Sequence, residues 1–89
     1  MSVAAKVDLK YPVSVGEETI TELVFKRPKV KHLREMDAID GDIAVTEAMI
    51  IALSGVSPAV AANIDAVDFA KISEVLAVFF VGIQPTGGK

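Results

Sequence analysis

The first part of the chain alternates between apolar and polar positions. A period of two is typical of a strand with one buried face. Pro12 lies among the polar positions, and because proline has no N–H to donate, we expect an edge strand or a strand end there. The apolar positions are Val7, Leu9, Tyr11, Val13 and Val15.

A second strand is expected over residues 19–27, after a short turn. This segment is rich in β-branched and aromatic residues, which favour strands. Ile20 has the opposite parity to Leu23, so we expect a β-bulge near Thr21-Glu22. The two strands would form a β-hairpin over 7–27, and because an isolated hairpin is only marginally stable, its apolar face must pack on other elements.

Helical spacing replaces the alternation after the second strand. Ser57-Pro58 is a clear helix start, because serine caps the N-terminus and proline suits the first helical position. Gly55 suits the end of the preceding helix, and Asp65 is expected to cap the last one. The expected helices cover 30–38, 42–54, 58–64 and a last stretch from Asp65 to about residue 83.

These elements predict an α+β fold class. The N-terminal β-hairpin is followed by three to four helices, packed in one small domain over residues 1–89. The helical part covers 30–83, and residues 84–89, which contain proline and two glycines, are expected to form a flexible tail.

Composition adds an apolar excess to this picture. Hydrophobic residues make up 52% of the 89 positions, and the mean hydropathy is +0.48. The excess is explained either by alanine and valine used as core and helix filler, or by apolar surface that a partner or a second copy covers. The longest apolar stretch, Val75 to Val81, is too short to span a membrane, and the N-terminus lacks the apolar run of a signal peptide. We therefore expect a cytoplasmic protein with no membrane partner.

Charge is distributed unevenly along the chain. The net charge of −3 argues against a nucleic-acid partner, which rewards a basic surface. Basic residues nevertheless gather between residues 26 and 34, whereas acidic residues dominate after Met36. The basic stretch, with Lys26, Arg27 and Lys29 at its start, is either a solvated strand end or a contact for an acidic surface on a partner or on a neighbouring copy.

Catalytic or metal-binding equipment is not recognisable in the sequence. The chain has no cysteine and a single histidine, His32, for which no nucleophile or orienting carboxylate can be nominated. Asp40-Gly41-Asp42 resembles only a fragment of a calcium-binding loop and is better explained by turn formation and helix capping. We expect no enzyme activity, no cofactor and no metal site, which leaves a protein-binding function.

Several short motifs follow one another in a recognisable order. They are Tyr11-Pro12-Val13, Ile20-Thr21-Glu22-Leu23, Lys26-Arg27-Pro28-Lys29, Leu33-Arg34, Asp40-Gly41-Asp42, Leu53-Ser54-Gly55-Val56-Ser57-Pro58, Ile64-Asp65-Ala66-Val67-Asp68 and the phenylalanine-rich last helix. Taken together over residues 10–82, this order resembles the phage tail assembly chaperones of the Mu-like, contractile-tail type.

The resemblance implies a function and a set of partners. A protein of this family would bind the long tape measure protein, keep it soluble and help recruit tail tube subunits in the bacterial cytoplasm, without entering the mature virion. It would also associate with a longer, frameshifted form of itself, and Gly87-Gly88-Lys89 is compatible with a slippery codon run. The alternative is a small homo-oligomeric structural or adaptor subunit without a chaperone role.

Candidate contacts for a helical partner lie on two of the predicted helices. Groove binding would place an amphipathic partner helix against apolar side chains. The candidates are Met49, Ile50, Leu53, Phe79 and Phe80. The competing interpretation is that these side chains form the core of the domain itself.

Overall fold

A computed structural model describes residues 4–79 of the chain, and it confirms the α+β class with an N-terminal hairpin followed by helices. The strands are β1 (Ala5–Val15) and β2 (Glu18–Phe25). The helices are α1 (Val30–Asp37), α2 (Asp42–Ser54), α3 (Pro58–Ala62) and α4 (Ala66–Val78). The predicted tail and the predicted end of the last helix lie outside the described residues.

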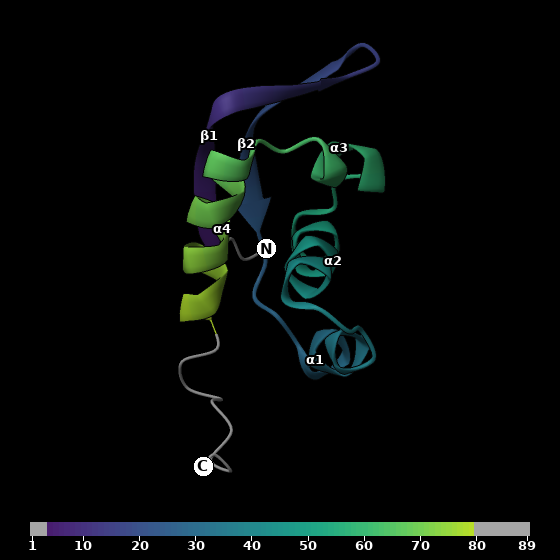
Figure 1. Cartoon of the computed structure of the whole chain (residues 1–89). Helices are drawn as coiled ribbons and strands as arrows, with labels where there is room; N and C mark the ends of the chain where they lie inside the picture. The colour runs from purple at the N-terminus through teal and green to yellow at the C-terminus, as the bar shows by residue number, and fades with distance from the viewer. Residues whose placement is uncertain (1–3, 80–89) are drawn as a thin grey trace.

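The hairpin is antiparallel but its register is interrupted. Asp8 pairs with Glu22, and the next regular pair is Val13 with Ile20. β1 therefore has more residues than β2 between these two pairs. A bulge near Thr21-Glu22 was expected from the parity of β2, and an irregularity is found at this position, with the additional residues on β1. Figure 1 shows the hairpin turning sharply part-way along, so that its tip extends away past α3.

This irregularity corrects one expectation for β1. Tyr11, expected on the apolar face, is 46% exposed because the alternation breaks beside it. Of the two alternatives expected from Pro12, the edge strand is confirmed, because the described sheet has two strands, and β1 continues past Pro12 to Val15. Pro12 is tolerated because it lies in the stretch where β1 lacks a regular partner residue on β2.

The extra residues of β1 are held by a side chain from the last helix. The carboxylate of Asp68 accepts hydrogen bonds from the backbone N–H groups of Lys10 and Tyr11, both at 2.9 Å. Asp68 is only 1% exposed, and it is the one buried charged residue in the described part of the chain. The two bonds satisfy donors that the interrupted ladder leaves without a strand partner, and they attach α4 to β1.

The helices cover the hairpin in two groups. α4 packs along β1, while α2 packs against β2 and carries α1 and α3 on its flanks (Figure 1). The N–H of Lys26 donates to the carbonyl oxygen of Leu53 at 3.0 Å, which joins the end of β2 to α2. The core lies between these groups and contains Val7, Leu9, Val13, Leu23, Phe25, Met49, Ile50, Leu53, Val60, Ala61, Ile72 and Leu76.

The helix ends follow the local signals in the sequence. Ser57 caps α3 by accepting the N–H of Val60 at 3.2 Å, and Asp65 caps α4 by accepting the N–H of Val67 at 2.9 Å. Gly55 ends α2 in the left-handed conformation, with φ of 80°. α3 is shorter than the predicted 58–64, ending at Ala62.

Candidate partner-binding surfaces

Two apolar hollows are lined in part by α2 and α4. The first, of about 350 Å³, is lined by Ile43, Glu47, Ala61, Ala62, Ile64, Ala66 and Phe69. The second, of about 200 Å³, is lined by Val45, Thr46, Met49, Ser73, Leu76 and Ala77. We refer to the two hollows together as the helical groove. Both hollows are lined by residues of α2 and α4, and the first is also lined by Ala61 and Ala62 of α3 and by Ile64.

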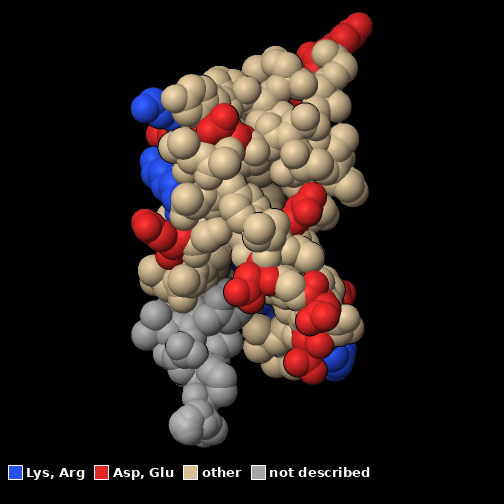
Figure 2. All heavy atoms as spheres, in the orientation of Figure 1, with Lys and Arg blue, Asp and Glu red and all other residues tan. Residues whose placement is uncertain are grey.

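One large apolar side chain that lines the helical groove is strongly exposed to solvent. Ile43, at the start of α2, lines the first hollow and is 71% exposed. In Figure 2 the face of the molecule over α3 and the adjoining parts of α2 and α4 is mostly uncharged. A large exposed apolar patch often marks an interaction site.

The structure places the sequence-predicted apolar contacts unevenly. Met49, Ile50 and Leu53 are 5%, 0% and 0% exposed and belong to the core, in agreement with the competing interpretation. Phe79 is half-buried and packs against the core, and Phe80 lies outside the described residues. A partner would reach Ile50 or Leu53 only after the core opened, so neither residue belongs to the helical groove. Met49 is 5% exposed and lines the second hollow.

Sequence reasoning missed the exposed rim of the groove. Ile43 and Ile50 lie seven residues apart on one face of α2, yet the first is 71% exposed and the second is fully buried. The hairpin and α4 cover only part of this apolar stripe. Which turn of α2 remains uncovered depends on the tertiary arrangement, which the sequence pattern alone does not give.

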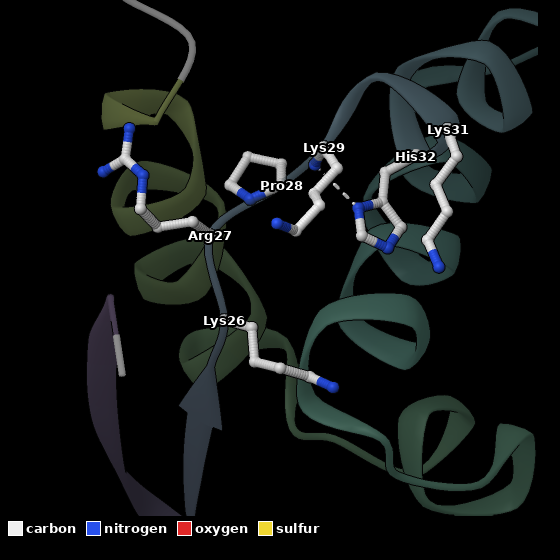
Figure 3. Close-up of a pocket in the computed structure, with 6 residues that line it drawn as sticks. All are labelled: Lys26, Arg27, Pro28, Lys29, Lys31 and His32. Carbon is white, nitrogen blue, oxygen red and sulfur yellow. Dashed lines mark hydrogen bonds between the residues drawn. The ribbon is translucent and has the colours of Figure 1, made fainter. Parts of the chain in front are cut away.

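The predicted basic contacts line a separate hollow. Lys26, Arg27, Pro28, Lys29, Lys31 and His32 surround about 310 Å³ at the connection between β2 and α1. In Figure 3 Lys26 and Arg27 extend in opposite directions from the backbone, and the side chain of Lys29 extends away from His32, toward Pro28. We refer to this feature as the basic hollow. Its lining includes Lys26, Arg27 and Lys29, the basic contacts predicted from the sequence, together with His32.

His32 has a structural role at this hollow. Its Nδ1 accepts a hydrogen bond from the N–H of Lys29 at 2.8 Å, which caps the start of α1 (Figure 3). The ring is half-buried and not fully solvated. Since Nδ1 is the acceptor, the neutral ring presents Nε2–H as a donor.

Other kinds of site are not found in the part of the chain that the structure describes. Residues 4–79 contain no group of three or more His, Asp or Glu side chains that could hold a metal ion. No helix among these residues is long and apolar enough to cross a membrane. Every buried side-chain nitrogen or oxygen in the described residues has a hydrogen-bond partner, so no buried polar group there awaits a ligand.

Comparison with protein-family models gives a match over most of the chain. A family model described as "Phage tail assembly chaperone proteins, E, or 41 or 14" matches residues 6–81, which include β1 except Ala5, all of β2, the four described helices and both surfaces described above. The searches of curated proteins and of solved structures found no match.

Proposed function

The chain belongs to the phage tail assembly chaperone family, and from this premise we propose that it binds the tape measure protein and keeps it soluble until the tail is built. Membership of a chaperone family suggests a role without catalysis. The contractile-tail type, expected from the order of motifs, is compatible with this family and remains a prediction.

The helical groove carries the proposal. It is lined mainly by apolar side chains of α2, α3 and α4, and one of them, Ile43, is 71% exposed. An amphipathic helix docks into such a groove with side chains spaced by three or four residues. A long helical partner could be covered by many copies of the chain, and the combined attachment would be strong even if each groove bound weakly.

The proposed partners extend beyond the tape measure protein. Tail tube subunits and a longer, frameshifted form of the chain are included because the family resemblance implies them. The proposed place of action is the bacterial cytoplasm, before the virion is complete. None of these steps requires a cofactor.

The test is co-expression with the tape measure protein of the same phage. We expect the tape measure protein to become soluble and to co-purify with several copies of the chain. Ile43→Asp should reduce the co-purified amount at least tenfold, because a carboxylate at the rim must be desolvated when an apolar helix docks. The measurement is the ratio of the two proteins after affinity purification through the tape measure protein.

Val30→Asp is a matched control for this substitution. Val30 is 71% exposed, as Ile43 is, but it begins α1 and does not line the groove. Both variants should keep the circular dichroism spectrum of the original chain. Equal loss of binding in both, or loss only in Val30→Asp, would exclude the helical groove as the binding surface.

A further inference from the structure

The helical groove contains a single charged side chain. Glu47 lines the first hollow, and no other Asp, Glu, Lys or Arg lines either hollow. It lies one helical turn after the exposed Ile43 on α2, so the two residues share one face of that helix. Glu47 is half-buried, and an occupant of the hollow would therefore remove more of its surface from water.

Glu47 has no charged partner within residues 4–79. The one ion pair among these residues joins Lys6 to Glu22, on the hairpin. Between residues 35 and 79 the only lysine or arginine is Lys71, which lines neither hollow. Figure 2 shows acidic side chains within the face over α2, α3 and α4, with the basic ones mainly toward its edges. The potential at the groove is thus negative, which favours an occupant with basic groups.

The other two polar side chains of the groove already use their hydrogens within their own helices. The hydroxyl of Thr46 donates to the carbonyl oxygen of Asp42 at 2.9 Å. The hydroxyl of Ser73 donates to the carbonyl oxygen of Phe69, also at 2.9 Å. Glu47 is left as the polar side chain that can select an occupant. Because a carboxylate only accepts hydrogen bonds, the group that it selects must be a donor.

We propose that the helical groove selects an amphipathic helix with a lysine or arginine beside its apolar stripe, and that Glu47 pairs with this cation. The inference rests on the proposed function, because it specifies the kind of segment that the groove binds in its partner. A helix with only apolar side chains at this point would bury the carboxylate without a partner, which is unfavourable. Since Ile43 and Glu47 are one turn apart, the cation should lie three or four residues from the apolar side chain that packs on Ile43.

Synthetic peptides of about 18 residues, or about five helical turns, test the charge of the occupant. The lysine peptide has leucines at helical spacing and lysines beside the leucine stripe. Its counterparts keep the leucines but carry glutamate or glutamine instead of lysine, or carry the lysines on the opposite face. Fluorescence anisotropy of labelled peptides at about 0.1 M salt measures their affinity for the isolated chain. We expect the lysine peptide to bind at least tenfold more tightly than each counterpart.

Substitutions of Glu47 assign this preference to one residue. Glu47→Gln should remove the difference between the lysine and glutamine peptides, and Glu47→Lys should bind the glutamate peptide better than the lysine peptide. Glu35→Lys is the matched control, because Glu35 is an exposed glutamate on α1 that lines neither hollow. It changes the net charge as Glu47→Lys does and should keep the original preference. All three variants should keep the circular dichroism spectrum of the original chain.

The outcomes distinguish this inference from the proposed function. Equal binding of the lysine and glutamine peptides, binding of none of the peptides, or an unchanged preference in Glu47→Lys would overturn the inference. The same reversal in Glu35→Lys would also overturn it, because net charge alone would then explain the preference. In each case the proposed function would stand if the tape measure protein still co-purified and Ile43→Asp prevented this. Failure of that co-purification would instead contradict the proposed function.

Discussion

At the scale of single residues, Asp68 joins the last helix, α4, to the first strand, β1. In the sequence it looks like an acidic residue in the first turn of a helix, where it would favour the helix dipole while remaining in water. In the structure it is buried and binds two backbone N–H groups of β1. The sequence contains no local signal for this, because the donors lie 58 and 57 residues away.

Replacement of Asp68 should therefore lower the free energy of unfolding by more than the loss of a helix cap does. Asp68→Asn keeps one acceptor oxygen but turns an amide toward the other N–H, and we expect a loss of about 1–3 kcal/mol in the free energy of unfolding. Asp68→Ala leaves both donors without an acceptor and should cost more. Urea unfolding followed by circular dichroism gives these values.

Asp65→Ala provides the comparison for this pair. It removes an exposed cap at the same helix end and should cost about 1 kcal/mol. If Asp68→Ala proved no more destabilising than Asp65→Ala, the two hydrogen bonds would not be important for the attachment of α4 to β1.

At the scale of elements, residues beside the helix ends determine where the helices begin and end. Gly55 has φ of 80°, and a Cβ atom added there would meet nothing within 4 Å. The cost of Gly55→Ala is thus one of backbone conformation alone, about 1–2 kcal/mol. Gly55→Asn should cost less, since asparagine tolerates the left-handed region better. Thermal unfolding of both variants tests this order, and equal stability of Gly55→Ala and the original chain would contradict it.

Local signals also explain how much of the fold could be predicted from the sequence. Ser57, Asp65 and Gly55 act on neighbouring backbone groups, so their positions defined helix ends that the structure confirms. The parity conflict at Ile20 similarly located the interruption of the hairpin, but not the strand that carries the extra residues. That choice depends on Asp68, which packs against β1 only in the folded molecule.

The candidate surfaces were predictable to a different degree. The basic hollow is built almost entirely from one continuous segment, so a run of charge in the sequence was enough to find it. The helical groove combines residues of α2, α3 and α4, which lie apart in the sequence, so no single run of residues indicates it. The contacts predicted on α2 from the sequence were Met49, Ile50 and Leu53, and all three are buried.

At the scale of the whole molecule, the small core leaves little reserve of stability. A domain of this size buries only about 60% of the surface of its unfolded chain. Leu53 is fully buried, and its carbonyl group also binds the N–H of Lys26, so it lies where α2 meets the end of β2. Substitution of a core residue on α2 should therefore lower the free energy of unfolding, whereas substitution of a contact residue should weaken partner binding and leave the stability nearly unchanged.

Leu53→Ala should remove about 2–5 kcal/mol from the free energy of unfolding, because it opens a cavity at this junction. Ile43→Ala, on the same helix but 71% exposed, should change it by less than about 0.5 kcal/mol. Chemical denaturation of both variants provides the comparison. A stable Leu53→Ala protein that no longer bound the tape measure protein would restore Leu53 as a contact residue.

The long separation between Asp68 and β1 also has a consequence for synthesis on the ribosome. The hairpin is translated first, but the acceptor for its Lys10 and Tyr11 N–H groups arrives only with the last helix. Until then the apolar face of the nascent hairpin has nothing to close over it from the α4 side. A product cut short before Asp68 would expose that face and be removed by proteases, so only chains translated through α4 would enter the pool available for tail assembly.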